Sequence, residues 1–297
     1  MQKTSLYLLL IFSMILSSCS KKLTSKVDLA AAEKETVYNV LKDVSYGSDP
    51  EQTMDIYLSQ KAKSFGKRNY TIVFLHGGGY YFSDKSQEER YIEPYLKKGL
   101  NVVNLNYRLK RGIPLATLDL THALNFLKAN NADYGLNLDN VIVTGFSAGA
   151  HIATNVGLAQ NNPEYPNKLD EGIVIVGIIN FSGPVDGLDV VERIFTEHEN
   201  ELYSKVGKAL FAPDDYESTA NIAIYEPITY FDKNDPPIFL WQAGLDDQIP
   251  PVTFERFVAM LRKDKDVIMY KPHGGHSPTK EELEYAYIEI FKFLNNL

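Results

Sequence analysis

The chain has 297 residues, 44% of them hydrophobic and 23% charged, which is typical of a folded globular protein. Its 38 acidic and 30 basic side chains give a formal net charge of −8, which argues against nucleic acid as a partner. Because Cys19 is the only cysteine, an internal disulfide framework and a cysteine-based zinc site are excluded.

The first residues have the pattern of a bacterial lipoprotein signal. Lys3 precedes an apolar run over residues 6–16, which is within the roughly 7–15 residues of a signal-peptide core and shorter than the roughly 20 of a bilayer span. Leu16-Ser17-Ser18-Cys19 resembles a lipobox. We therefore predict a signal peptide over residues 1–18, a lipid on Cys19 and a polar tether over 19–35, with the protein anchored in a bacterial cell envelope. The alternative is a plain secretory leader with an incidental cysteine.

The body of the chain, residues 36–297, alternates strand and helix patterns. Residues 37–44 and 53–58, separated by turn residues, predict an antiparallel hairpin at a sheet edge. Near-continuous apolar runs predict strands buried on both faces, at 71–75, 101–105, 141–144, 173–176 and 238–241, with a further strand at 267–270. Helical periodicity marks residues 116–127, 150–158, 254–261 and 281–294. The alternation predicts an α/β fold with a mostly parallel central sheet and helices on both faces.

Residues 189–223 interrupt this alternation. They are charged and aromatic and contain no strand pattern. We predict an insertion over the edge of the sheet where the parallel strands end, which makes it a candidate lid.

The motif Gly145-Phe146-Ser147-Ala148-Gly149 lies directly between a predicted strand and a predicted helix. A serine presented on such a sharp turn needs glycines on both sides, because a β-carbon there would clash with the neighbouring backbone. The setting predicts that Ser147 is a nucleophile. The alternative is a glycine-rich turn with a capping serine.

A second motif, His76-Gly77-Gly78-Gly79, follows the strand predicted at 71–75. Consecutive glycines let backbone amides converge on one point, as a negatively charged tetrahedral oxygen requires. We predict an oxyanion hole formed by the amides of Gly78, Gly79 and Ala148, with His76 holding the loop rather than acting as a base. The alternative is a flexible glycine loop.

Asp246 and His276 complete the chain order Ser…Asp…His, and each follows a predicted strand. The carboxyl ends of parallel strands meet at one edge of the sheet, so Ser147, Asp246 and His276 are the predicted catalytic residues. Asp247 is the rival acid. The alternatives are a helix cap for Asp246 and a loop hydrogen-bonding role for His276. No step of this chemistry needs a metal.

Several motifs together resemble α/β-hydrolases of the hormone-sensitive-lipase-like type: His76-Gly77-Gly78-Gly79-Tyr80, Asn106-Tyr107-Arg108-Leu109, Pro114 with Asp119, Gly145-Phe146-Ser147-Ala148-Gly149 with His151, and Asp235-Pro236-Pro237 before Asp246. Tyr46-Gly47-Ser48-Asp49-Pro50 with Asp55-Ile56-Tyr57-Leu58 is similar to bacterial feruloyl and acetylxylan esterases. The resemblance covers residues 37–297 and implies the α/β-hydrolase fold and catalysis without a cofactor. Ala150 departs from the pattern, since a third glycine is frequent there.

The expected function is a serine carboxylic-ester hydrolase acting on short-acyl esters, with acetyl or feruloyl groups on polysaccharide as the substrates. We expect acetyl above all, because the insertion at 189–223 is too short and too charged to form a long acyl groove. The alternatives are a general small-molecule carboxylesterase and a non-catalytic, glycan-binding envelope module with the same fold.

Overall fold

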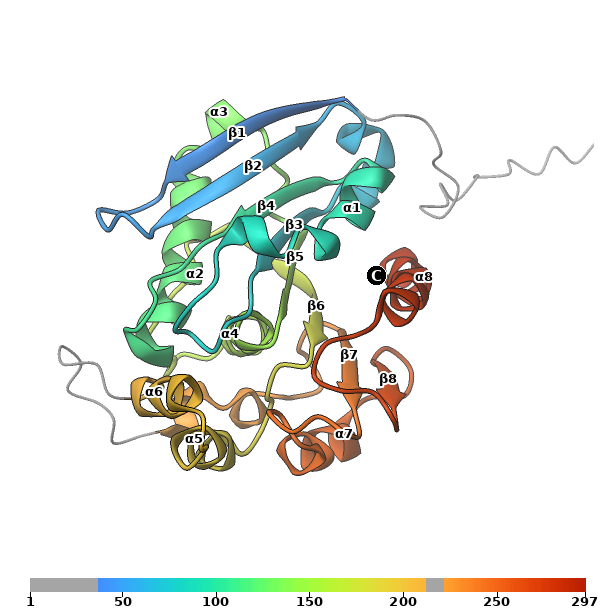
Figure 1. Ribbon diagram of the computed structural model, residues 1–297. Coiled ribbons are helices and arrows are strands. Elements are labelled where there is room, and N and C mark those ends of the chain that lie inside the picture. Colours follow the sequence, from blue (N-terminus) through green and yellow to red (C-terminus); the bar gives the residue numbers. More distant parts are fainter. Residues whose placement is uncertain (1–36, 212–221) are drawn as a thin grey trace, which may run out of the picture.

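An eight-stranded sheet runs through the part of the chain that the computed structural model describes, residues 37–211 and 222–297 (Figure 1). The predicted leader, Cys19 and the tether lie outside the described residues, as does part of the predicted insertion, residues 212–221. The strands, in chain order, are β1 (Tyr38–Ser45), β2 (Thr53–Ser59), β3 (Thr71–Leu75), β4 (Asn101–Leu105), β5 (Val141–Phe146), β6 (Ile175–Phe181), β7 (Ile238–Ala243) and β8 (Val267–Lys271).

The order of the strands across the sheet is β1-β2-β4-β3-β5-β6-β7-β8. The pairs β1–β2 and β2–β4 are antiparallel, and every other neighbouring pair is parallel. The predicted edge hairpin and the predicted mostly parallel sheet are therefore confirmed. All of β3, β4 and β5 is buried, as their continuous apolar runs predict.

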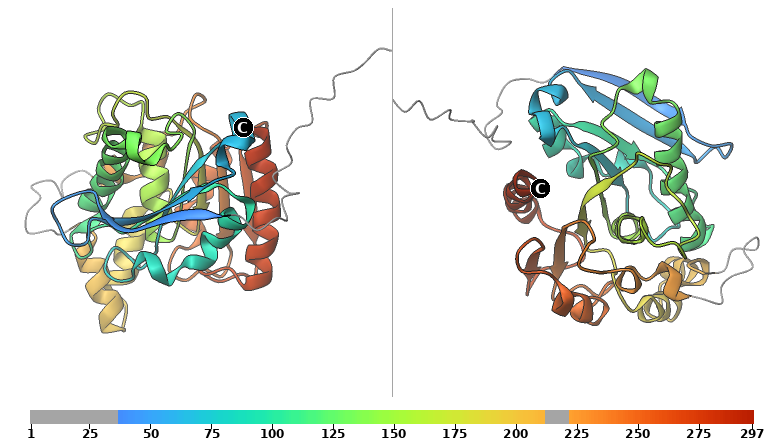
Figure 2. Two further views of the ribbon diagram at one scale, coloured as in Figure 1. Left: turned by 90° about the horizontal axis from the view of Figure 1, so that it is seen from above. Right: turned by 180° about the vertical axis from the view of Figure 1, so that it is seen from behind.

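Helices cover both faces of the sheet (Figure 1, Figure 2). They are α1 (Glu93–Lys98), α2 (Gly112–Ala129), α3 (Asn131–Tyr134), α4 (Ala148–Ala159), α5 (Leu188–Thr196), α6 (Glu201–Ala209), α7 (Glu255–Met260) and α8 (Lys280–Asn296). One hydrophobic cluster joins α2 and α4 to the sheet, and a second joins α1 and α8 to the other face. The single tryptophan, Trp241 in β7, is fully buried in the second cluster.

Strand β6 differs from its prediction. The sequence predicts a strand at residues 173–176, whereas β6 spans Ile175–Phe181. The side chain of Val174 is 45% exposed, and its amide donates to the carbonyl of Leu138, so this residue belongs to the connection that enters the sheet. An apolar run alone does not reveal whether its first residues reach the core.

Up to residue 211, the predicted insertion forms two helices, α5 and α6, which pack closely on each other. Asn200 caps the N-terminus of helix α6, and its side chain accepts a hydrogen bond from the amide of Leu202. The amide of Ile113, at the start of α2, donates to the carbonyl of Leu210 directly after α6. The sequence did not predict these helices, and movement of this segment as a lid stays a prediction.

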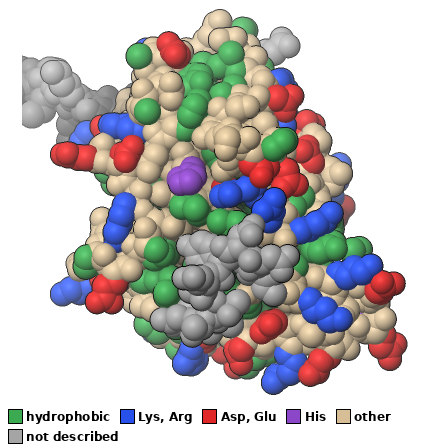
Figure 3. Space-filling view, turned by 90° about the vertical axis from the view of Figure 1, so that its left-hand side faces the viewer, with side chains coloured by type: hydrophobic (Ala, Val, Ile, Leu, Met, Phe, Trp, Pro, Cys, Tyr) green, Lys and Arg blue, Asp and Glu red, His purple; other side chains and the backbone are tan. Residues whose placement is uncertain are grey.

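On the face drawn in Figure 3, acidic and basic side chains are interspersed among hydrophobic ones and backbone atoms. Within residues 37–211 and 222–297, no helix combines the length and the apolar composition needed to cross a bilayer.

Candidate active site

Ser147 lies on a sharp turn between β5 and α4, with φ 51° and ψ −120°. A β-carbon on Gly145 would stand 2.4 Å from the carbonyl carbon of Gly149, and one on Gly149 would stand 2.2 Å from the carbonyl oxygen of Leu75. Both positions therefore require glycine, as the motif predicts. The backbone conformation of Ser147 itself is rare for a residue with a side chain and is held by the surrounding structure.

The side chains of Ser147, His276 and Asp246 come together at the carboxyl ends of β5, β8 and β7. The Oγ atom of Ser147 is 2.9 Å from Nε2 of His276, and Nδ1 of His276 is 2.8 Å from Oδ2 of Asp246. A carboxylate only accepts, so Nδ1 carries the proton and donates to Asp246. The unprotonated Nε2 is then free to accept the hydroxyl proton of Ser147.

The carboxylate of Asp246 is buried and fully engaged. Its Oδ1 atom accepts hydrogen bonds from the amides of Gln248 at 2.9 Å and Ile249 at 2.8 Å, while Oδ2 faces His276. The neighbouring Asp247 is exposed. The structure thus places Asp246, and not Asp247, against the imidazole.

Two residues that the sequence did not single out hold His276 in place. The hydroxyl of Ser182 donates to the backbone carbonyl of His276 at 2.7 Å, and the ring centroid of Phe146 lies 5.1 Å from that of the imidazole. Ser182 is fully buried, with φ 56°. No sequence signal identified Ser182, because the strand predicted at 173–176 ends before it and only the observed β6 leads directly to it.

The predicted oxyanion residues adjoin Ser147. Gly78 and Gly79 line a pocket together with Ser147, and both have positive φ, 102° and 60°. A β-carbon on Gly78 would stand 2.0 Å from the carbonyl oxygen of Phe82, so the loop over residues 76–82, here called the oxyanion loop, can close only with glycine there. Ala148 is the first residue of α4, where backbone amides have no partner within the helix.

His76 is the first residue of the oxyanion loop, and its side chain is buried. Its Nδ1 atom is 2.7 Å from the carbonyl of Gly77, and its ring stacks on Tyr107 with the centroids 4.5 Å apart. Burial lowers the pKa of His76 to about 4, so the imidazole is neutral at physiological pH. The hydroxyl of Tyr107 donates to the carbonyl of His76 at 3.0 Å. These contacts suit the predicted role of His76 in holding the loop.

His151, one turn into α4, connects the oxyanion loop to the segment after the insertion. Its Nε2 atom is 2.7 Å from the carbonyl of Tyr225, so Nε2 carries the proton, and Nδ1 accepts a hydrogen bond from the hydroxyl of Tyr80 at 2.7 Å. Complete burial lowers the pKa of His151 to about 4.

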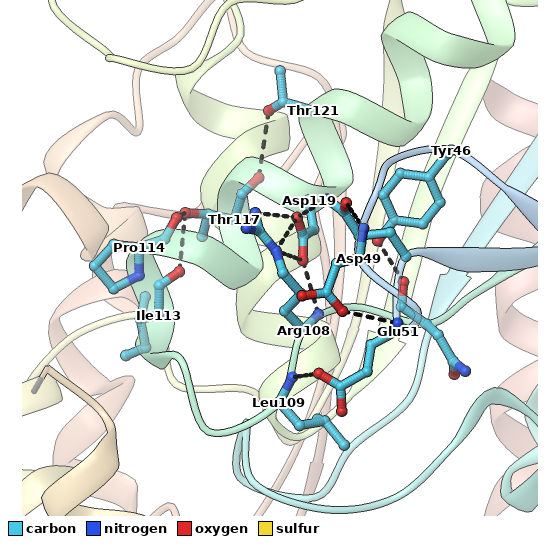
Figure 4. A network of polar contacts seen from close by, with 12 residues as sticks. Tyr46, Asp49, Glu51, Arg108, Leu109, Ile113, Pro114, Thr117, Asp119 and Thr121 are labelled. Atoms are coloured by element: carbon cyan, nitrogen blue, oxygen red, sulfur yellow. Dashed lines mark hydrogen bonds and ion pairs between the residues drawn. The ribbon is translucent and has the colours of Figure 1, made fainter. Parts of the chain in front are cut away.

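The loop between β4 and α2 is fixed by an ion pair between the partly exposed Arg108 and the buried Asp119 (Figure 4). The guanidinium of Arg108 contacts Asp119 through Nη2 at 2.6 Å and through Nε at 3.0 Å, and the amide of Gln52 donates to the same carboxylate at 2.8 Å. Two residues further on, the amide of Lys110 donates to the carbonyl of Tyr80 at 2.8 Å. The distinctive turn of the edge hairpin therefore supports the oxyanion loop from outside.

Two cavities meet at Ser147. The large pocket, about 330 Å³, also adjoins His276 and has a mixed polar and aromatic lining that includes Phe82, Gln87, Glu88, Tyr203 and Gln248. The small pocket, about 20 Å³, is lined mainly by apolar side chains from the start of α2, from α5 and α6 and from the loop after β7, among them Ile113, Leu188, Val191, Phe195, Val206 and Ile249. The described part of the insertion thus forms walls of both cavities.

In the part of the chain that the structure describes, no three His, Cys, Asp or Glu side chains are grouped so that they could hold a metal ion.

A family model, BD-FAE, matches residues 54–261 of the chain. Among curated proteins, endo-1,4-beta-xylanase B of Butyrivibrio fibrisolvens is 26% identical over 238 residues, which cover 74% of this chain and 34% of that protein. Esterase LipC of Mycobacterium tuberculosis is 23% identical over 252 residues, which cover 78% of this chain and 58% of that protein.

Among solved structures, a bifunctional GH43-CE protein of Bacteroides eggerthii superimposes with a TM-score of 0.66 at 23% sequence identity, covering 86% of this chain and 38% of that one. This likeness shows the fold. The chain spans less than two thirds of the length of each of these three proteins.

Proposed function

Because the chain belongs to the BD-FAE family of α/β-hydrolase esterases, we propose that it is a serine esterase that removes short acyl groups, acetyl or feruloyl, from polysaccharide. The observation that carries the proposal is the alignment of Ser147, His276 and Asp246, with contacts of 2.9 and 2.8 Å. This geometry supplies a nucleophile, a base for its proton and an acid that orients the base.

In the first step, Oγ of Ser147 attacks the carbonyl carbon of the ester while its proton passes to Nε2 of His276. The negative charge on the former carbonyl oxygen is stabilised by the amides of Gly78, Gly79 and Ala148, and each such donor typically contributes about 3–4 kcal/mol. The bond to the alcohol oxygen then breaks, and the alcohol leaves with the proton from His276.

In the second step, water attacks the acyl group held on Ser147 and gives its proton to His276. The bond to Oγ breaks, the carboxylic acid leaves, and the proton returns to Ser147. Throughout, Asp246 holds the imidazole with its proton on Nδ1 and stabilises the imidazolium that forms.

Within this proposal, the small pocket takes the acyl group, and its size favours acetyl over feruloyl. Its volume of about 20 Å³ is close to the ~10–15 Å³ that one water molecule requires, so it matches a methyl group. An aryl acid would need the apolar side chains of Val191, Phe195 and Val206 to move apart.

Two other functions are distinguished by experiment. A general small-molecule carboxylesterase would hydrolyse aryl and alkyl acetates and leave acetylated xylan intact. A non-catalytic glycan-binding module would bind polysaccharide and hydrolyse neither ester. The contact between Ser147 and His276 favours catalysis over a binding role, because binding alone requires no base beside a serine.

The proposal is tested with a fluorophosphonate probe, which reacts with an activated serine. We expect one labelled site, mapped to Ser147 by mass spectrometry, and loss of both label and 4-nitrophenyl acetate hydrolysis in Ser147→Ala. Ser86→Ala, a change at an exposed serine, serves as the matched control and should keep both. Hydrolysis by Ser147→Ala within tenfold of the parent rate would refute the serine mechanism.

We further propose that the protein is anchored in a bacterial cell envelope through a lipid on Cys19. The apolar run followed by Leu16-Ser17-Ser18-Cys19 supports this proposal. Cys19→Ser should abolish incorporation of labelled fatty acid and leave an uncut leader or a protein released from the membrane fraction. Unchanged processing and membrane association would overturn it.

A further inference from the structure

Glu88 places a carboxyl group in the large pocket. The proposed acyl transfer does not use this carboxyl group. It lies between the 3-10 helices at Lys85–Gln87 and Glu89–Tyr91 and lines the pocket together with Ser147 and His276. Its Oε2 atom accepts a hydrogen bond from the amide of Gly77, at 3.4 Å, in the oxyanion loop.

The other carboxyl oxygen of Glu88, Oε1, accepts no hydrogen bond from the residues that the structure describes. Burial raises the pKa of Glu88 to about 7, while the Gly77 amide and the nearby Arg90 guanidinium oppose this shift. A partly buried carboxyl group with one unused oxygen is therefore available to a hydrogen-bond donor that enters the pocket.

The rest of the lining is suited to an alcohol that carries several hydroxyl groups on a ring. The amide side chains of Gln87 and Gln248 can donate to and accept from hydroxyls, and the rings of Phe82 and Tyr203 offer flat apolar surfaces. The volume of about 330 Å³ lies at the lower end of the ~300–1,000 Å³ of small-molecule sites.

The two cavities divide the ester between them. The small apolar pocket suits the acyl group, and the large pocket then takes the alcohol part on the other side of the scissile bond. We propose that Glu88 accepts a hydrogen bond from a hydroxyl group of the alcohol part, and so selects esters of carbohydrates over esters of alcohols without free hydroxyls. This inference rests on the proposed function, since it requires the acyl transfer at Ser147.

The test compares two acetates that share the acyl group and differ in the alcohol: acetylated xylo-oligosaccharides, which carry free hydroxyls, and 4-nitrophenyl acetate, which has none. We measure kcat/KM on both for the parent, for Glu88→Gln and for the matched control Glu89→Gln, whose side chain is exposed. Melting temperatures establish that all three proteins are folded.

At pH 8, above the pKa of about 7 of Glu88, we expect the ratio of kcat/KM for the oligosaccharide to that for the aryl acetate to fall about tenfold to hundredfold in Glu88→Gln, the range for losing a hydrogen bond to a charged group. The ratio for Glu89→Gln should match the parent ratio. Equal losses on both substrates in Glu88→Gln would overturn the inference, because they would limit Glu88 to supporting Gly77, and an unchanged ratio would overturn it as well.

The failure of this inference is distinct from that of the proposed function. A parent enzyme that hydrolyses 4-nitrophenyl acetate through Ser147 but not the oligosaccharide would overturn the role of Glu88 and leave the serine esterase mechanism standing. Persistent hydrolysis in Ser147→Ala would overturn the mechanism itself.

Discussion

The hydroxyl of Tyr80 donates a hydrogen bond to Nδ1 of His151 across 2.7 Å, in a fully buried setting. Through the other ring nitrogen, His151 is bound to the carbonyl of Tyr225. One imidazole thus connects the oxyanion loop, the helix that follows Ser147 and the chain that returns from the insertion. The position of the oxyanion amides consequently depends on a side chain that takes no part in the proposed chemistry.

Tyr80→Phe should therefore impair both stability and turnover. The change leaves Nδ1 of His151 buried without a donor, which typically costs about 1–3 kcal/mol, and it frees the oxyanion loop from α4. Urea unfolding measures the first effect and kcat for 4-nitrophenyl acetate the second. Tyr81→Phe is the control, because the Tyr81 hydroxyl makes no hydrogen bond with any described residue. Equal losses of stability and of kcat in the two variants would contradict the role of the contact between Tyr80 and His151.

Asp246→Asn should lower kcat by on the order of 10³–10⁴-fold, because an amide at this position no longer holds the imidazole with its proton on Nδ1. Asp247→Asn should leave kcat within a factor of two, since this carboxylate is exposed and does not contact His276. Steady-state kinetics on a short aryl ester checks both. The reverse pattern would transfer the acid role to Asp247.

Val206→Ala should widen the small pocket and shift the preference toward longer acyl chains. Val206 is buried on α6 and lines both cavities beside Ser147. A pocket that accommodates one or two additional methylene groups typically changes the ratio of kcat/KM between two acyl chains by about tenfold or more. The butyrate-to-acetate ratio of kcat/KM should therefore rise by about that factor. Leu202→Ala, at an exposed position of the same helix, is the control. A parent enzyme with its maximum at C10 or longer would contradict the short-acyl assignment.

The raised pKa of Glu88 predicts a pH dependence of stability. The folded protein holds this proton up to about pH 7, whereas the unfolded chain releases it near pH 4.5, so stability falls as the pH rises between these values. Glu88→Gln has no titratable group at this position and so lacks this pH-dependent loss of stability. The variant should be more stable than the parent by about 1–3 kcal/mol at pH 8, with little difference at pH 4. Urea unfolding of both proteins at the two pH values provides the test. A difference that does not change with pH would contradict the assignment.

Much of the sheet could be predicted because its central strands are buried on both faces and so are continuously apolar. The turn at Ser147 could also be predicted, since two glycines between a strand and a helix satisfy a local steric requirement. The choice of Asp246 over Asp247 could only be favoured from the sequence, because it depends on which carboxylate faces a histidine thirty residues later.

Other features of the site have no local signature. Ser182 contacts the carbonyl of a residue 94 positions further along the chain, and nothing in its neighbourhood distinguishes it from an ordinary serine. Glu88 lies in a charged segment that reads as a solvated loop, and only the folding of that segment against Gly77 brings its carboxyl group into the pocket. Both residues acquire their surroundings from tertiary contacts.

Trp241 gives this protein an optical signal in the core strand that leads to the proposed catalytic acid. The only tryptophan lies in the strand that leads to Asp246, and its carbonyl accepts a hydrogen bond from the amide of Ser182, which in turn holds His276. Its emission therefore reports the entry of β7 into the core during refolding. Since Ser147 and His276 are 129 residues apart and β8 is an edge strand, the nucleophile meets its base only when this non-local pairing is complete. Recovery of catalysis will accordingly follow the fluorescence change or coincide with it. The delay between the two signals measures how long after β7 the edge strand β8 joins the sheet.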